Sequence, residues 1–225
     1  MDCEIVIQQL KKTAKPENLA GMSRFGINTQ NALGISVYDV QRLGKAIGNN
    51  HKLALNLWAS GIHEARILAG YVDESTKVME KQMENWVLDF DSWDLCDQIS
   101  STLFDKTKFA YKKAVEWSTR EEEFVKRSAF VLMASLSVHD KKASDDKFEE
   151  FLPIIVAAAT DERNFVKKGV NWALRQIGKR NITLNSHAIK SADTIKNIDA
   201  KSAKWIASDA LRELKSDKIQ RMLMN

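Results

Sequence analysis

The 225-residue sequence predicts an all-helical protein, and three observations support this prediction. The chain has only two prolines and nine glycines, the residues that break or weaken helices. Apolar residues recur at helical spacing nearly throughout, and no segment shows the alternation of a half-buried strand. A short motif also returns after about 40 residues, as it does in repeat proteins. We therefore expect an α-solenoid of stacked antiparallel helix pairs, forming a single domain over residues 1–225.

The apolar periodicity places the helices in order along the chain. They are expected at roughly residues 2–13, 37–48, 51–58, 61–72, 80–88, 93–104, 106–118, 121–138, 145–159, 162–178, 183–197 and 199–214. Residue types that cap helix starts stand in the short linkers: Ser36, Ser144, Thr160 and Asp161. Gly48 and Gly178 stand where two helices should end. No linker is long enough to mark a domain boundary.

An internal repeat indicates the kind of solenoid. The segment 123–127 (Glu-Phe-Val-Lys-Arg) returns as 164–168 (Asn-Phe-Val-Lys-Lys), and a weaker copy covers 202–206 (Ser-Ala-Lys-Trp-Ile). Each copy falls on the second helix of an expected pair. A period near 40 with two helices per unit is typical of HEAT-like repeats. The second helices should then line one concave, basic groove.

Composition excludes several classes of protein. No apolar stretch approaches the length that spans a bilayer, and the N-terminus lacks the pattern of a signal peptide. Cys3 and Cys96 are too few for a disulfide framework, and no Cys/His spacing suggests a metal site. We expect a cytoplasmic, monomeric protein with no metal and no cofactor.

The positive charge of the chain is concentrated in its last third. Residues 160–225 contain fourteen Lys or Arg against seven Asp or Glu, whereas the remainder carries twenty against twenty-three. Such a distribution favours a polyanionic partner bound at one face. An ordinary solvated, lysine-rich surface explains the count equally well.

The expected helix from 93 carries an unusual pair. Its apolar stripe contains Leu95, Cys96, Ile99 and Leu103. Trp93 and Asp97 are four residues apart, so they are neighbours on the helix surface, and they point away from that stripe. A functional pair is one interpretation. In the other, Trp93 packs as an N-terminal staple and Asp97 pairs with a lysine.

The helix expected at 162–178 has a basic side with a tryptophan in its middle. Its core stripe contains Val166, Val170, Ala173 and Ile177. The opposite wedge contains Lys168, Trp172, Arg175 and Lys179. Cations neutralise phosphates and an aromatic ring offers a flat face to a base, a sugar or a cation, so this wedge suits a nucleic acid. Packing of Trp172 against a neighbouring repeat is the alternative.

Arg127 occupies the same repeat position as Lys168. The core stripe of its helix contains Val125, Ala129, Leu132 and Leu136, and Arg127 lies off that stripe. A guanidinium there could hold a phosphate through two hydrogen bonds. A salt bridge to Glu123 is the alternative. His63 and His139 stand beside charged residues, but no nucleophile in a recognisable setting accompanies them.

Three segments together resemble a known family. Residues 90–97 (Phe-Asp-Ser-Trp-Asp-Leu-Cys-Asp), 125–130 (Val-Lys-Arg-Ser-Ala-Phe) and 169–175 (Gly-Val-Asn-Trp-Ala-Leu-Arg) resemble the motifs of the DNA alkylation repair glycosylases of the AlkD type. The resemblance extends from about Met22 through the last repeat. The chain resembles a divergent branch, because Asp94, Cys96, Lys126 and Lys168 are not a fixed part of the family pattern.

The resemblance implies an enzyme that binds duplex DNA and excises cationic N3- and N7-alkylated purines. Carried over by position, the aromatic pair of the family falls on Trp93 and Trp172. Its catalytic carboxylate falls on Asp97 and its phosphate-contacting arginine on Arg127. Some relatives with this fold do not excise bases. A non-catalytic module for damaged or branched DNA therefore stays an alternative, and a protein-interaction scaffold is a weaker one.

Overall fold

The computed structural model describes residues 2–224, and every regular element within that range is a helix. This confirms the all-helical class. The chain forms two compact units, one ending at Lys108 and the other beginning at Phe109. The single domain expected over residues 1–225 stays a prediction. None of the helices in the described range is long and apolar enough to cross a membrane.

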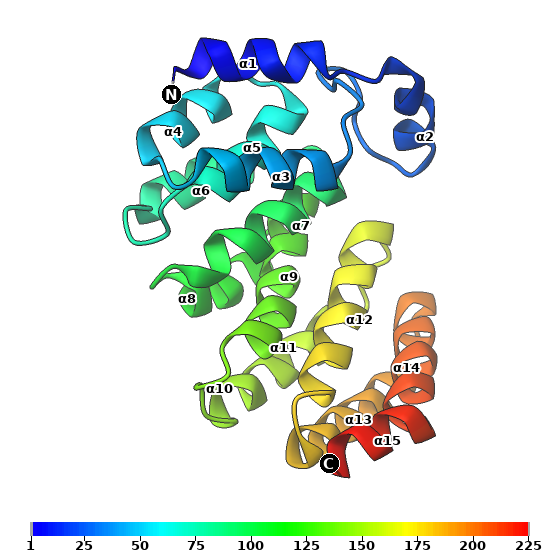
Figure 1. Cartoon of the computed structure of the whole chain (residues 1–225). Helices are drawn as coiled ribbons and strands as arrows, with labels where there is room; N and C mark the ends of the chain where they lie inside the picture. The colour runs from blue at the N-terminus through cyan, green and yellow to red at the C-terminus, as the bar shows by residue number, and fades with distance from the viewer. Residues whose placement is uncertain (1, 225) are drawn as a thin grey trace. The chain divides into compact units, whose positions relative to one another are not determined.

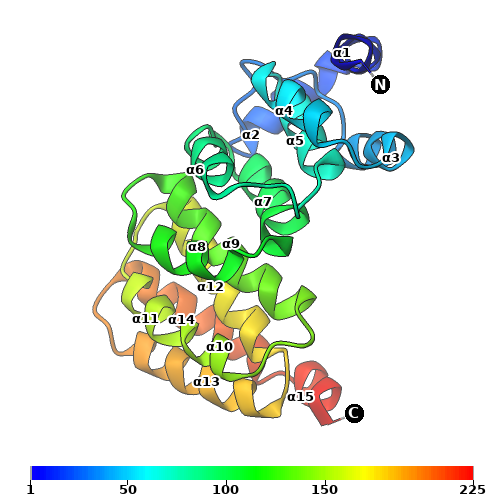
Figure 2. The ribbon, with the colours of Figure 1, turned by 90° about the vertical axis from the view of Figure 1, so that its left-hand side faces the viewer.

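The first unit is built around one buried helix. Its α-helices are α1 (Cys3–Lys12), α2 (Leu19–Arg24), α3 (Val37–Ile47), α4 (His51–Ala59), α5 (His63–Val72), α6 (Glu80–Leu88) and α7 (Trp93–Thr102). Short 3-10 turns at Pro16–Asn18 and Phe104–Lys106 complete it. Helix α5 packs against α3, α4 and α7 (Figures 1 and 2). It therefore fixes where α7, with Trp93 and Asp97, lies in this unit.

A buried carboxylate anchors the loop that precedes α3. Glu64 on α5 is fully buried and accepts hydrogen bonds from the backbone N–H groups of residues 33–35, at 2.7–3.1 Å. Gly34 has a φ of +78°, and a Cβ there would lie 2.1 Å from the carbonyl oxygen of Lys15. Only glycine fits this conformation and this close approach. The loop is thereby tied to both α5 and the end of α1.

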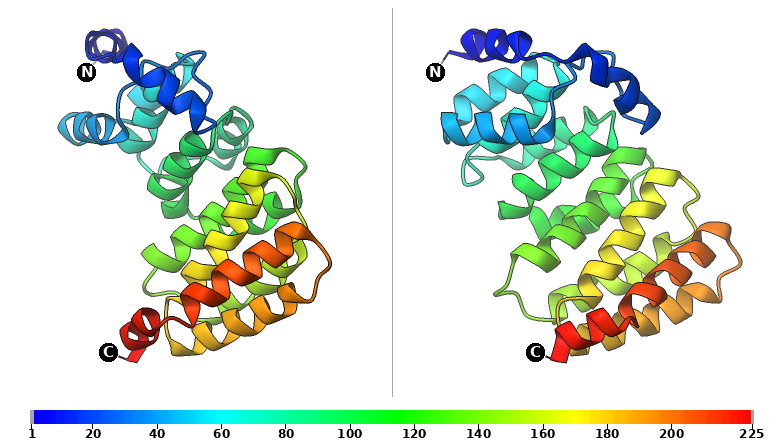
Figure 3. Two further views of the ribbon diagram at one scale, coloured as in Figure 1. Left: turned by 90° about the vertical axis from the view of Figure 1, so that its right-hand side faces the viewer. Right: turned by 45° about the vertical axis from the view of Figure 1, so that its right-hand side comes forward.

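The second unit contains the predicted repeats. Its α-helices are α8 (Ala110–Glu116), α9 (Glu123–His139), α10 (Asp146–Glu149), α11 (Phe151–Ala158), α12 (Asn164–Gly178), α13 (Ile182–Lys196), α14 (Lys201–Leu214) and α15 (Asp217–Met224). A 3-10 turn at Trp117–Thr119 links α8 to α9. Helices α9, α12 and α14 lie side by side, seen in green, yellow and orange-red in Figure 3, and α11 and α13 form the opposite layer.

The three copies of the motif lie where the repeat predicts. They occupy the first turns of α9, α12 and α14, each the second helix of its pair. Phe124 and Phe165, which are equivalent in the repeat, place their ring centroids 5.6 Å apart. Repeat-equivalent side chains therefore pack against each other between neighbouring second helices, as in a HEAT-like stack.

Several element boundaries differ from expectation for identifiable reasons. The helix expected at 145–159 is split into α10 and α11, because Pro153 lacks an N–H and its ring excludes the carbonyl of Glu149. The helices α2 and α15 were not predicted; they are only six and eight residues long. Ser36 caps α3 as expected, accepting from the N–H of Asp39 at 3.2 Å. Gly178 ends α12 as predicted.

Candidate functional site

Helix α7 presents the predicted pair on its outer side. The core stripe is confirmed, because Leu95, Cys96 and Ile99 have no exposed surface. Trp93 is the first residue of the helix and Asp97 follows one turn later, and both are half-buried. An indole and a carboxylate thus share one solvent-accessible edge of the first unit.

The start of α7 is fixed by the segment that follows α2. The indole Nε1 of Trp93 donates to the carbonyl oxygen of Phe25 at 3.0 Å. The backbone N–H of Asn28 donates to Ser92 Oγ at 2.8 Å, and its side-chain amide donates to Asp91 Oδ2 at 2.8 Å. The bond to Phe25 satisfies the polar edge of Trp93, and the two bonds from Asn28 hold the residues just before it. Its remaining accessible surface is aromatic.

Asp94, the residue that follows Trp93, belongs to a buried histidine–aspartate pair. His63 Nε2 and Asp94 Oδ2 are 2.9 Å apart, and both residues are less than a tenth exposed. Burial by itself lowers the pKa of His63, but its hydrogen bond with Asp94 and the charge of that carboxylate more than offset burial and raise the pKa above its usual value. The pair joins α5 to the first turn of α7, and a cavity of about 250 Å³ lies beside it.

Arg127 lies inside the second unit. The sequence placed it off the core stripe of α9, yet only 6% of its surface is exposed. Helix α9 is buried on nearly all sides, as the fully buried Phe130 and Val131 show. The Arg127 Nη1 donates to the carbonyl oxygen of Phe165 on α12 at 2.6 Å. The guanidinium therefore joins two second helices, and its contact with a phosphate stays a prediction.

The basic wedge of α12 is partly neutralised within the protein. Lys168 is exposed and Trp172 is half-buried, on the side opposite the fully buried core stripe. Lys179 Nζ lies 2.7 Å from Glu213 Oε1 on α14, and Arg175 pairs with the other oxygen of the same carboxylate. Two of the three cations predicted to contact DNA on this helix thus have internal partners.

Asp161 holds the starts of α9 and α12 together. Its Oδ2 lies 3.0 Å from Lys126 Nζ on α9 and 2.6 Å from Arg163 Nη2, just before α12. Arg163 also donates to the carbonyl oxygen of Glu121. Burial raises the pKa of Asp161, but the hydrogen bonds from Arg163 and Lys126 prevail and lower it to about 2.

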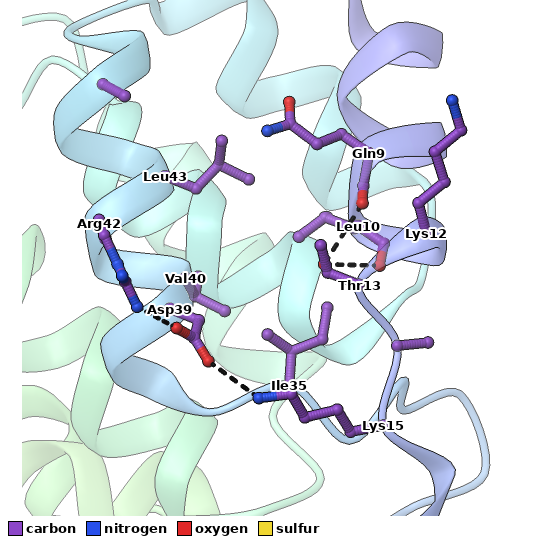
Figure 4. Close-up of a pocket in the computed structure, with 12 residues that line it drawn as sticks. Gln9, Leu10, Lys12, Thr13, Lys15, Ile35, Asp39, Val40, Arg42 and Leu43 are labelled. Atoms are coloured by element: carbon purple, nitrogen blue, oxygen red, sulfur yellow. Dashed lines mark hydrogen bonds and ion pairs between the residues drawn. The ribbon is translucent and has the colours of Figure 1, made fainter.

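One cavity lies away from all the predicted residues. It has a volume of about 590 Å³ and lies between α1 and α3 (Figure 4). Asp39 projects beside it, between Lys15 and Arg42, and pairs with both (Figure 4). Within residues 2–224, no group of three or more His, Cys, Asp or Glu side chains is arranged to hold a metal.

Comparison with known proteins identifies the family. The sequence profile described as "DNA alkylation repair enzyme" matches residues 6–214. The chain belongs to this family. The comparison with curated proteins gives no match. A solved structure described as "a new family of proteins related to the HEAT-like repeat DNA glycosylases with affinity for branched DNA structures" superposes with a TM-score of 0.77. It is 18% identical in sequence, over 95% of each chain.

These comparisons confirm the HEAT-like fold and the resemblance that the sequence motifs carry. The region matched to the DNA alkylation repair family contains Trp93, Asp97, Arg127 and Trp172. The sequence analysis did not single out the His63–Asp94 pair. A signal existed, because His63 and Glu64 stand one turn before Ile67 and Leu68 and so fall on the apolar side of α5. Polar residues in such positions are paired when the helix is buried.

Proposed function

We propose that this protein is a DNA glycosylase that hydrolyses the N-glycosidic bond of cationic N3- and N7-alkylated purines in duplex DNA. One observation carries the proposal: Trp93 and Asp97 share the accessible edge of α7, and the polar edge of the indole is tied to Phe25. Membership of the DNA alkylation repair family supports it.

The substrate chemistry needs only a carboxylate at this edge. Alkylation places a formal positive charge on the purine, so the base leaves as a neutral molecule with the electrons of the glycosidic bond. The deoxyribose then develops oxocarbenium character, which an adjacent carboxylate stabilises. Water forms the new bond to the anomeric carbon and loses a proton to the Asp97 carboxylate or to solvent. Neutral lesions keep a poor leaving group and should be poor substrates.

In this proposal the other predicted residues bind the DNA and take no part in breaking the glycosidic bond. The ring face of Trp93 in the first unit binds the deoxyribose or the cationic base, and the ring face of Trp172 in the second unit has the same binding role; each such cation–π contact contributes about 0.5–2 kcal/mol. Arg127, which joins α9 to α12, contacts the DNA backbone through the small part of its surface that is exposed. Exposed Lys168 contacts phosphate, and Arg175 and Lys179 do so to the extent that DNA competes with Glu213.

Base release tests the catalytic role directly. Wild type should release 7-methylguanine from methylated duplex DNA, and Asp97→Asn should slow release about 100-fold or more. Its affinity for the same DNA should stay within about threefold of wild type. Asp217→Asn, an exposed acid on α15, is the matched control and should retain full activity. Full base release by Asp97→Asn would refute the role of this carboxylate.

A second candidate is binding of branched DNA without catalysis, which the described affinity of the similar structure favours. In this candidate function the basic residues still bind DNA, and Asp97 has no catalytic role. A four-way junction should then bind more tightly than a linear duplex, with affinity that falls steeply with salt. No base release by wild type, together with such a preference, would replace the glycosylase proposal with this one.

A further inference from the structure

The outer side of α14 carries a second basic and aromatic surface, which the predicted site does not use. At 100° per residue its exposed positions fall in one wedge. We refer to them as the α14 stripe: Lys201, Lys204, Trp205, Ser208, Arg212 and Lys215. The opposite side of the helix is fully buried against the rest of the second unit. The stripe therefore faces solvent.

Trp205 is unusual for an exposed position. It keeps 40% of its surface accessible, although tryptophan has a large apolar area and is well buried on average. Lys167 on α12 lies over its ring, with Nζ 5.5 Å from the centroid. Trp205 also stands in the third copy of the repeat motif, in register with the first turns of α9 and α12. An exposed ring beside α12 and among cations is a candidate stacking surface.

The lysines beside Trp205 on the α14 stripe are available to a ligand. Lys201 has no ion pair among residues 2–224. Lys204 pairs with Asp199, but their side chains are 60% and 96% exposed. Solvated pairs of this kind are weak and yield to a phosphate. The charge of the stripe therefore favours a polyanion over a neutral apolar partner.

We propose that the α14 stripe binds single-stranded DNA, with Trp205 stacked on an unpaired base and Lys201 and Lys204 on its phosphates. A base inside a duplex has both faces stacked on its neighbours, so an unpaired base in a flanking strand offers its face to the indole more readily. The proposal rests on the proposed DNA-binding function and extends it to a strand that flanks the duplex. It needs no catalytic role for Asp97.

The experiment compares a blunt duplex with the same duplex carrying a short single-stranded overhang. Wild type should bind the overhang DNA about tenfold more tightly, measured by fluorescence anisotropy. Trp205→Ala should abolish that gain, which corresponds to about 1.4 kcal/mol, and Trp205→Phe should retain most of it. Affinity for the blunt duplex should not change. Ile182→Ala, an exposed apolar residue of α13 at 53% exposure, is the matched control.

Two further readouts make the outcome decisive. A 2-aminopurine in the overhang should be quenched by wild type and by Trp205→Phe but not by Trp205→Ala, because quenching reports stacking. Release of 7-methylguanine from blunt duplex should be equal in all variants. An overhang preference without base release would refute the glycosylase and leave this inference standing. Equal affinity of wild type for both DNAs, or an overhang preference that survives in Trp205→Ala, would overturn the inference.

Discussion

Replacing Asp161 by Asn should destabilise the protein in a pH-dependent way. The Asp161 side chain is only 9% exposed, and Lys126 and Arg163 bind its carboxylate. These contacts lower its pKa from an ordinary 3.8 to about 2. A difference of nearly two units corresponds to about 2 kcal/mol of stability at neutral pH. Asn keeps the shape but loses the charge, so most of this contribution should disappear.

The sign of the pH dependence follows from the lowered pKa. The stabilisation is fully present above 3.8, where the unfolded chain is also ionised, and is lost as the pH falls towards 2. The difference in unfolding free energy between wild type and Asp161→Asn should therefore be about 2 kcal/mol at pH 7 and about 1 kcal/mol at pH 3.

Urea unfolding at both pH values, followed by circular dichroism, measures these differences. Asp199→Asn serves as the control, because the exposed pair of Asp199 with Lys204 should contribute nothing measurable. An equal effect of Asp161→Asn at pH 7 and pH 3 would refute the electrostatic account of this site. So would an effect no larger than that of the control.

Two further predictions concern the packing of each unit. The raised pKa of His63 means that its pair with Asp94 stabilises the first unit below the ordinary pKa of 6.5, and less as the pH rises through the folded value. His63→Gln should thus destabilise more at pH 6 than at pH 9 in urea unfolding; equal effects would exclude a charged histidine. Gly178→Ala should lower the melting temperature, because its Cβ would lie 2.7 Å from Leu214 Cδ2, and overpacking costs about 1–3 kcal/mol. Gly21→Ala, within α2 and with no atom near its Cβ position, should not lower it.

The local parts of the fold and site could be predicted because they depend on spacing within one helix. Leu95, Cys96 and Ile99 recur at helical intervals, so Trp93 and Asp97 had to lie on the other side of α7 whatever packs against it. The repeat at 123–127 and 164–168 likewise fixed which helices are neighbours. These inferences need no knowledge of distant residues.

The burial of Arg127 could not be predicted in this way. Apolar periodicity defines the most apolar side of α9, but the second side is buried by α12, which packs along it. A residue off the stripe is then enclosed by a neighbour that is 38 residues away in sequence, as its bond to Phe165 shows. The sequence also predicted Gly178 only as a helix end and did not show why glycine is needed there. It is required by the closeness of Ala188 and Leu214, not by a left-handed backbone.

The number of cations in the last third of the chain did not predict which of them are available to bind DNA. The excess of cations in residues 160–225 includes Arg175 and Lys179, which both pair with Glu213 near the end of α12. Lys168, near the start of the same helix, is exposed and has no ion pair within the described residues. A phosphate at Lys168 displaces only water, whereas one at Lys179 must compete with a carboxylate.

Lys168→Gln should therefore weaken duplex binding. It should also reduce the slope of log Kd against log salt concentration by close to the amount that one phosphate contact contributes. Lys179→Gln removes a charge that is already paired and should change both quantities less. Anisotropy titrations over a range of salt concentrations measure the two slopes. Equal losses for the two variants would show that DNA displaces Glu213 and that the whole wedge of α12 binds phosphate. A greater loss for Lys168 would confine the contact to the first half of α12, the end at which Lys167 and Trp205 meet.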